Sequence, residues 1–218
     1  MKSTNTHKKI GKRTYLATII PLVMAAQVQG YEFFMGEVEG SLDSQISMGS
    51  SWRLERQDTR LTQGITGTQI LAENGNEGDL NYEKDDAFSN IFKGSHDLQV
   101  KYQNYGAFIR GKYWYDQALE NDSQQDDSGY NDLAKFSGAE VLDAFVYGAF
   151  DVLGMPLDVR LGKQVVNWGE STFIHGGVNQ VNPVDISSFR RPGAEIKEGL
   201  IPVNMAFASL GMTDNLSF

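Results

Sequence analysis

The chain has 218 residues, of which 19 are basic and 28 are acidic, so its formal net charge is −9, and it contains no cysteine. The lack of cysteine excludes disulfide-stabilised scaffolds, cysteine-ligated metal sites and lipoproteins, whose lipid anchor is a cysteine. The acidic balance argues against nucleic-acid binding, because phosphate contacts depend on lysine and arginine.

The first thirty residues (1–30) have the organisation of a secretory signal peptide. Five basic residues and no acidic residue lie before an apolar stretch at 15–26. This stretch is too short to span a bilayer as a helix, which requires about 20 apolar residues. We expect cleavage after Gly30 or Ala26, with a short buried N-terminal helix as the alternative. Loss of the five positive charges changes the net charge from −9 to −14 for the mature chain 31–218.

The clearest structural signal in the mature chain is strict alternation over 42–55. Apolar residues such as Leu42, Ile46 and Met48 fall on one face of an extended chain, and polar residues such as Asp43 fall on the other. A period of two indicates a β-strand. The run is longer than the ~5–6 residues of an ordinary strand and fits the ~9–11 residues of a strand that crosses a bilayer.

Two hairpins are predicted next. The first joins 97–103 to 107–116 through Asn104, Tyr105 and Gly106, residue types that tolerate a tight turn. The second joins 139–151 to 157–167 around Gly154, Met155 and Pro156. Segment 139–151 is apolar on both faces, so a buried helix is an alternative there. Lys163 falls on the apolar face of its strand, which requires a bulge near Gly162 or a position at the membrane interface.

The connections between the predicted strands alternate between long and short. Long connections are expected at about 56–95, 119–138 and 168–202, and further strands at about 203–210 and from 216 onward. This alternation is typical of outer-membrane barrels, which have short periplasmic turns and long outer loops. The predicted fold is all-β, an antiparallel up-and-down transmembrane β-barrel. About seven strands are present, which is fewer than the even number, at least about eight, of single-chain barrels. The chain is therefore expected to be the N-terminal part of an incomplete barrel.

In this topology one face of each strand contacts lipid and the other lines the barrel interior. Trp52, Tyr113 and Tyr115 lie at the outer ends of their strands, where an aromatic girdle is expected. Charged groups mixed with large aromatic rings on the interior face favour an amphiphilic or aromatic solute, although an interior packed by a plug is the alternative. The predicted interior residues are Arg53, Phe108, Arg110, Lys112, Trp114, Asp143, Phe145, Tyr147, Arg160 and Gln164.

The connection at 168–202 is longer than loops usually are. It contains Arg190, Arg191, Glu195 and Lys197 in an otherwise acidic protein. We predict a loop that folds into the interior as a constriction, with the two arginines as anion contacts. A structured outer loop held by local ion pairs is the alternative.

No catalytic, metal or cofactor site is expected. Ser171, His175 and Asp185 do not match a hydrolase, because the sequence around Ser171 lacks the second glycine of a nucleophile elbow. His96 and His175 are too far apart in sequence to indicate a metal pair.

Several stretches together resemble a known protein family. The most specific are 160–171, RLGKQVVNWGES, and 190–204, RRPGAEIKEGLIPVN. Shorter ones lie at 36–40, 88–94 and 110–116. The mature chain resembles the proteobacterial outer-membrane proteins of domain-of-unknown-function family 1302, over the N-terminal third of a typical member. The resemblance implies an outer-membrane location and two partners: a periplasmic lipoprotein-carrier-like protein and an exporter of the resistance-nodulation-division class.

The predicted function is non-catalytic transport or export of hydrophobic or amphiphilic small molecules, such as lipids or steroids, across the outer membrane. Outer-membrane lipid is an expected partner and nucleic acid is not. Two alternatives remain open. One is a structural or adhesive barrel that works through its acidic outer loops. The other is a soluble periplasmic β-sandwich that binds a ligand in its long loops.

Overall fold

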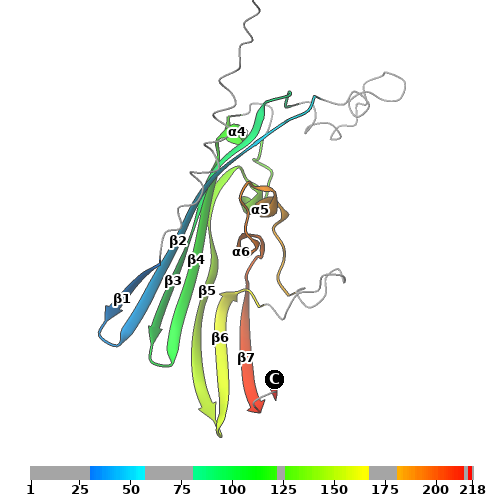
Figure 1. Ribbon diagram of the computed structural model, residues 1–218. Helices are drawn as coiled ribbons and strands as arrows, with labels where there is room; N and C mark the ends of the chain where they lie inside the picture. The colour runs from blue at the N-terminus through cyan, green and yellow to red at the C-terminus, as the bar shows by residue number, and fades with distance from the viewer. Residues whose placement is uncertain (1–29, 57–80, 122–125, 167–180, 214–215, 218) are drawn as a thin grey trace, which may run out of the picture.

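The computed structural model describes residues 30–56, 81–121, 126–166, 181–213 and 216–217. They form one antiparallel sheet of eight strands whose spatial order is the chain order (Figure 1). The strands are β1 (Tyr31–Met35), β2 (Val38–Trp52), β3 (Ala87–Tyr102), β4 (Tyr105–Asp116), β5 (Ser137–Val152), β6 (Met155–Gln164), β7 (Val203–Thr213) and β8 (Leu216–Ser217). The predicted all-β, up-and-down architecture is confirmed. Within the described residues β1 and β8 each pair with one neighbour, so the sheet is open.

Two details of the sequence prediction are corrected, and one alternative is excluded. The sheet has eight strands rather than about seven, because β1 pairs with β2 through a turn in which Gly36 has a φ of 65°. β3 begins at Ala87, so its first ten residues (87–96) belong to the sheet and not to a long connection. The strand predicted at 139–151 lies within β5, so the alternative of a buried helix there is wrong.

The connections follow the predicted alternation. Two-residue turns join β1 to β2, β3 to β4 and β5 to β6, whereas the connections at 53–86, 117–136 and 165–202 are long. The second and third turns lie one or two residues earlier than predicted, at 103–104 and 153–154. Gln103, Leu153 and Gly154 have positive φ there, as tight hairpins require. The sheet therefore has a short-turn end and a long-connection end.

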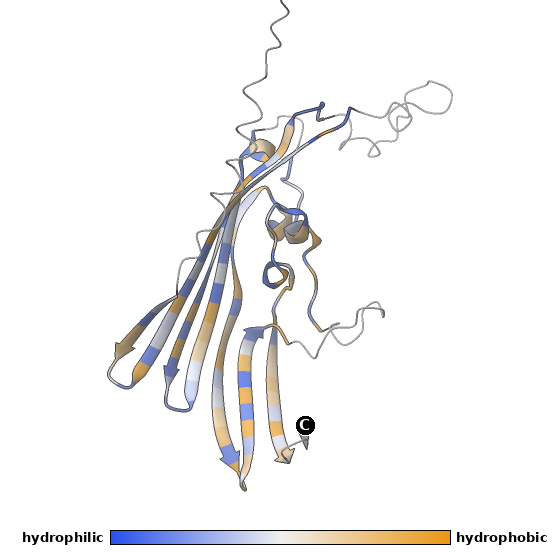
Figure 2. Cartoon of the chain, in the orientation of Figure 1, coloured by the Kyte–Doolittle hydropathy of each residue, from blue (hydrophilic) through white to orange (hydrophobic). Residues whose placement is uncertain are grey.

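The sheet has two chemically distinct faces, because residues paired across strands point to the same side. One row runs across β3 to β7 as Val100, Ala107, Val146, Leu161 and Ala206, and defines the apolar face. The next residue of each strand points to the opposite face, and Figure 2 shows the resulting alternation of hydropathy along β6. That opposite side carries most of the charged side chains and is called the polar face.

Short helices occupy the long connections. They are α4 (Gln117–Glu120), the 3₁₀ turn η1 (Asp132–Ala134), α5 (Ile186–Arg190) and α6 (Ile196–Gly199). Among the described residues, no helix combines the length and the apolar character needed to cross a membrane. Helices α5 and α6 belong to residues 181–202, here called the docked segment, which lies beside the sheet above β6 and β7 in Figure 1.

Gly162 allows β6 to keep its pairing. Its φ is 134°, and a Cβ built there would lie 2.4 Å from the carbonyl oxygen of Ala144 and 2.8 Å from the Cα of Phe145. The pairing of β5 with β6 continues to Lys163 without a register shift, so the local distortion is taken up by glycine rather than by an inserted residue. The bulge predicted near Gly162 is therefore absent, and a glycine with positive φ stands in its place.

The variant Gly162→Ala is expected to lower the free energy of unfolding by about 2 kcal/mol, because alanine disfavours this φ and its Cβ meets the β5 backbone. Urea unfolding of the protein refolded in detergent measures the change. Gly129→Ala is the control, since a Cβ added at that position would have nothing within 4 Å. Equal stability of the two variants would contradict the strained-glycine interpretation.

Candidate functional site

The docked segment is a closed loop with two paired arms. The backbone N–H of Asp185 donates to the carbonyl of Gly199 at 2.7 Å, and that of Ile201 donates to the carbonyl of Pro183 at 2.9 Å. The Asp185 side chain caps α5 by accepting from the backbone N–H of Ser188 at 3.2 Å. The docked segment is therefore held by backbone hydrogen bonds of its own, in addition to its contacts with the sheet.

Asn182 ties the base of this loop to the end of β6. Its side-chain oxygen accepts from the Val166 N–H at 3.0 Å. Its amide nitrogen donates to the carbonyls of Gln164 at 3.3 Å and Ile201 at 3.1 Å. The side chain is only 3% exposed, so these bonds replace those that water would make.

Lys93, on the polar face of β3, holds α6 and the residues just before it. Its Nζ donates to Glu198 Oε2 at 2.6 Å and to the Gly193 carbonyl at 2.7 Å. The side chains of Lys93 and Glu198 are 5% and 12% exposed. A buried charge of this kind requires a partner, so the pair fixes where α6 lies on the sheet.

Lys112, on β4, contacts both α5 and α6 of the docked segment. Its Nζ donates to Ser188 Oγ at 2.9 Å and to the Glu198 carbonyl at 3.1 Å, and lies 3.4 Å from Asp185 Oδ2. Burial alone raises the pKa of the Asp185 carboxyl, but the hydrogen bonds from Ser188 and the charges of Lys112 and Arg191 outweigh it. The pKa of Asp185 therefore lies below its ordinary value, and the carboxylate stays charged against Lys112.

Arg191 packs on the sheet as an anchor. Its guanidinium lies 4.3 Å from the centre of the Trp114 ring, and Nη2 donates to the carbonyls of Leu133 at 2.8 Å and Lys135 at 3.2 Å. Burial lowers the pKa of Arg191, although arginine remains protonated. The segment also meets the sheet through Gln45, which donates to Glu195.

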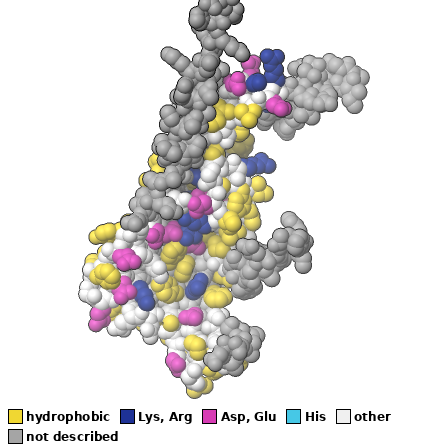
Figure 3. Space-filling model, viewed as in Figure 1, with side chains coloured by type: hydrophobic (Ala, Val, Ile, Leu, Met, Phe, Trp, Pro, Cys, Tyr) yellow, Lys and Arg dark blue, Asp and Glu magenta, His cyan; other side chains and the backbone are white. Residues whose placement is uncertain are grey.

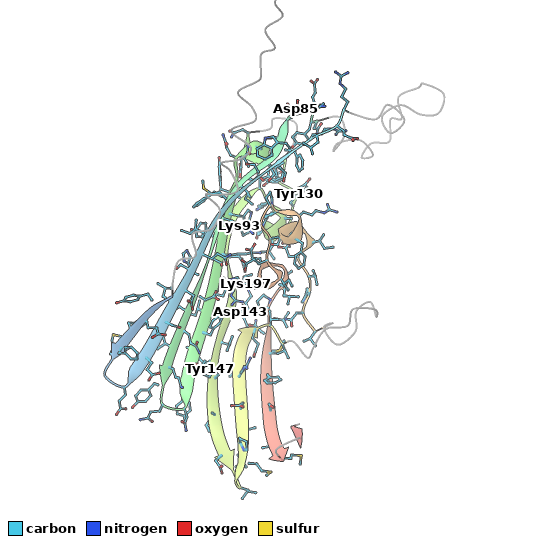
Figure 4. All side chains as sticks on the ribbon, in the orientation of Figure 1. Asp85, Lys93, Tyr130, Asp143, Tyr147 and Lys197 are labelled. Atoms are coloured by element: carbon cyan, nitrogen blue, oxygen red, sulfur yellow. The ribbon has the colours of Figure 1, made fainter. Side chains whose placement is uncertain are left out.

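Nearer the short-turn end, charged groups of the polar face pair with each other. Arg110 donates to both carboxylate oxygens of Asp97, at 2.7 Å from Nε and 2.6 Å from Nη2, and its Nη1 lies 3.4 Å from Asp143 Oδ2. Figure 4 places the labelled Asp143 just below Lys197 of the docked segment. This bidentate pairing of Arg110 with Asp97 is the common geometry between arginine and a carboxylate.

Aromatic rings surround a second arginine on this part of the face. The Arg160 guanidinium lies 6.0 Å from the Phe145 ring centre and 5.7 Å from that of Phe207. Phe108 and Phe145 have ring centres 5.4 Å apart. Tyr147 accepts a hydrogen bond from Gln99 at 2.7 Å. Within the described residues no carboxylate forms an ion pair with Arg160, so its charge faces only rings and solvent.

The structure divides the predicted interior residues into two groups. The docked segment covers one of these groups. Gln164 belongs to it and has no exposed surface, so a solute does not reach Gln164 in this arrangement. Arg53 lies beyond the end of β2 and donates to the Glu55 carbonyl at 3.0 Å. The covered residues are Lys112, Trp114 and Gln164, Asp143 is also buried at 5% exposed, and those left open are Phe108, Arg110, Phe145, Tyr147 and Arg160.

The four predicted constriction residues have different roles. Arg191 is anchored to carbonyls, whereas Arg190 is exposed. Lys197 Nζ lies 3.3 Å from Glu195 Oε2. The hydrogen bond from Gln45 is the main cause that lowers the pKa of Glu195. The prediction that the arginines contact an anion stays a prediction.

Several residues of the site were missed from the sequence. Lys93 was placed in a connection because the start of β3 was missed, and Glu198, Ser188 and Asn182 have no local pattern that marks them as contacts. The available signal for β3 is the polar residues at every second position from Lys93 to Asp97.

Ser171 and His175 lie outside the described residues. Asp185 is engaged with Ser188 and Lys112, and Ser188 is only 1% exposed, so this serine–lysine contact serves docking. The part of the chain that the structure describes holds no group of three or more histidine, aspartate or glutamate side chains placed to bind a metal ion.

Residues 12–218 match a protein family described as "Protein of unknown function (DUF1302)". The match includes every described strand and the whole docked segment. No curated protein and no solved structure matches the chain.

Lys93→Met is expected to release the docked segment, because it leaves the Glu198 carboxylate buried without its partner. Breaking a buried pair costs about 3–5 kcal/mol, so hydrogen-exchange protection of amides in 181–202 is expected to fall at least about a hundredfold. Lys135→Met is the matched control, because its partner Asp132 is 88% exposed. It is expected to change that protection less than about fivefold. Similar effects of the two variants would refute the anchoring role of Lys93.

Docking is also expected to weaken in acid. A depressed pKa in the folded state means that Asp185 contributes stability above its unfolded pKa of about 3.9, and that this contribution is lost as the pH falls through the lower folded value. Protection factors of the docked segment are therefore expected to stay constant from about pH 7 to 5 and to drop below about pH 4. Asp185→Asn should reduce the acid-dependent drop. A loss of protection on raising the pH from 5 to 7 would have the wrong sign.

Proposed function

We propose that this chain, which belongs to the family described as "Protein of unknown function (DUF1302)", forms part of an outer-membrane β-barrel that takes part in transport or export of hydrophobic or amphiphilic small molecules. The protein acts without catalysis. The apolar face contacts lipid, the polar face lines the path, and the docked segment narrows it.

The observation that carries this proposal is a pair of aromatic belts on the apolar face. Trp52, Phe92 and Tyr115 are exposed there toward the long-connection end. Near the short-turn end, the exposed aromatic residues are Tyr102, Tyr105 and Phe150. Membrane barrels have aromatic residues at both water interfaces, with an apolar band between them.

The separation of the belts matches a bilayer. Phe92 and Tyr102 are ten residues apart on β3, as are Tyr105 and Tyr115 on β4. At about 3.3 Å per residue this is roughly 33 Å along the strand. A strand tilted by about 40° spans roughly 25 Å along the membrane normal, the height of the apolar band in outer-membrane barrels.

Two polar side chains on the apolar face between the belts, His96 and Lys163, have partners, which fits a lipid-facing surface. His96 Nδ1 lies 2.8 Å from Ser44 Oγ. Lys163 donates to Glu140 Oε1 at 2.9 Å and to the Val141 carbonyl at 2.6 Å. Exposed apolar side chains cover most of the remaining band, including Ile109, which is 46% exposed. A water-facing surface of this kind is unusual for a monomeric soluble protein.

The chemistry of the polar face supports an amphiphilic solute. Phe108, Phe145 and Arg160 combine aromatic surface with a guanidinium that has no carboxylate partner among the described residues. Figure 3 shows charged side chains of both signs beside hydrophobic ones at mid-height of the visible face. A solute with an apolar body and a polar or anionic group fits this mixture.

Location and partners follow the same proposal. The signal peptide expected at 1–30 directs export, and the protein then inserts into the outer membrane. A periplasmic lipoprotein-carrier-like protein and an exporter of the resistance-nodulation-division class deliver or accept the solute at the short-turn end. The route then continues past the docked segment to the long-connection end.

Release of the docked segment is expected to increase flux. The complete gene product and its Lys93→Met, Glu198→Gln double variant are reconstituted into liposomes, and efflux of an entrapped amphiphilic dye is followed. The double variant removes the pair that holds α6, so about tenfold faster efflux is expected if the segment limits passage. Lys163→Met with Glu140→Gln is the control and should match the native rate, because this pair joins β6 to β5 and holds no part of the docked segment. Equal rates for the native protein and empty liposomes would remove the transport proposal, and an unchanged rate in the double variant would remove the gate.

A further inference from the structure

A cavity of about 320 Å³ lies at the long-connection end of the sheet, between α5, η1 and the first residues of β3. This volume lies at the lower end of the range of small-molecule sites, about 300–1,000 Å³, and suits a ring system rather than a whole lipid. Three cationic and three aromatic residues among those that line it give the cavity its chemistry: Lys135, Arg190, Arg191, Tyr82, Phe88 and Phe136. We call this cavity the Arg190 pocket.

The positive charge of the pocket is not neutralised by its lining. Asp116 is the only acidic residue among the described residues that line it. Its carboxylate accepts from Ser89 Oγ and from the backbone N–H groups of Asn90 at 2.9 Å and Ala118 at 3.1 Å. Asp116 is 3% exposed, and its hydrogen bonds cap α4 and hold β3, while its charge acts on Arg191. The lining therefore has three cations and one carboxylate.

Arg190 is the cation left available to a ligand. Its side chain is exposed, and within the described residues no hydrogen bond or ion pair engages its guanidinium. The neighbouring Arg191 uses Nη2 to hold the Leu133 and Lys135 carbonyls. Lys135 pairs only with Asp132, which is 88% exposed, and such a surface pair is weak. An anion in the pocket therefore meets one free guanidinium and a second that is held in place.

Aromatic rings form the rest of the pocket. The Tyr82 and Phe88 ring centres are 5.9 Å apart, and Phe136 packs edge-on against Tyr130 at 6.1 Å. Phe88 is the extra residue of a bulge, since Ser51 pairs with Ser89 and Trp52 pairs with Ala87. Bulges of this kind redirect a side chain near functional sites. The bulge thus places an aromatic ring in the pocket instead of in a regular row of the sheet.

We infer that the Arg190 pocket binds an organic anion, a carboxylate or sulfonate joined to an aromatic or similarly flat apolar body. Arg190 binds the acidic group through charge-assisted hydrogen bonds, and the rings of Tyr82, Phe88 and Phe136 contact the apolar body. This inference deepens the proposed transport function and rests on it, because the pocket lies on the long-connection side of the docked segment, where a solute enters or leaves. Arg190 and Ser187 of that segment line it, so an occupied pocket contacts α5 directly.

The test measures binding of 2-naphthalenesulfonate to the full chain in phosphatidylcholine nanodiscs by equilibrium dialysis, with empty nanodiscs as the blank. Arg190→Gln is expected to weaken binding at least about tenfold, since hydrogen bonds to charged groups contribute about 1.5–3 kcal/mol. Phe88→Ala should also weaken binding. Lys101→Gln is the matched control: Lys101 is an exposed cation at the opposite end of β3, and its loss should change the affinity less than about twofold.

Two results would overturn the inference: no binding above the empty nanodiscs, or the same dissociation constant for Arg190→Gln and the native chain. Binding that depends on Arg190 supports it even if liposomes show no flux, because dialysis requires no transport. Flux without Arg190-dependent binding would leave the transport proposal standing and remove the pocket. Arg191 is not varied, because it also anchors the docked segment.

Discussion

The arrangement of this molecule depends on two buried ammonium groups on one face of a sheet. Lys93 and Lys112 are each 5% exposed at their side chains, and an uncompensated charge in such a place costs several kcal/mol. Their partners come from Glu198, Asp185 and Ser188, about 70 to 105 residues further along the chain. The docked segment is therefore part of the folded sheet and not an independent loop, because without it both lysines would have to be exposed to water.

The two buried lysines lie on one of two chemically different faces of the sheet. Alternation of side chains in β2 to β7 sends charges to one side and apolar groups to the other, so compensation of the charges needs a cover on one face only. The apolar face has no cover among the described residues, and its exposed rings and aliphatic groups have no polar segment to contact. In the barrel that we propose, a bilayer contacts this face as the docked segment contacts the other, and the two surroundings of the sheet are lipid and an enclosed polar space.

Much of the fold was predictable because it is local. A period of two over β2, β4 and β6 fixes both strand type and facing, and the lengths of connections fix the two ends of the sheet. β1 was missed because Tyr31–Met35 is short and aromatic rather than alternating, and the start of β3 was missed because small and polar residues interrupt its pattern. The docking contacts were not predictable, since Asn182 and Glu198 acquire their roles only from residues that tertiary structure brings near. Even the adjacent arginines differ: one stacks on Trp114, and the other remains exposed.

In the transport path that we propose, these contacts distinguish residues that hold the structure together from residues available to a solute. Arg110 is held by Asp97 and Asp143, so a passing anion must compete with two carboxylates to engage it. Arg160 and Arg190 have no such competitor among the described residues; the first lies beside Phe145, and the second lines an aromatic pocket. Lys93, Lys112 and Arg191 hold the docked segment between these regions. Because Arg160 and Arg190 do not anchor the docked segment, the affinity of the proposed path for an anion can change at these two residues without loss of the contacts that keep the segment in place.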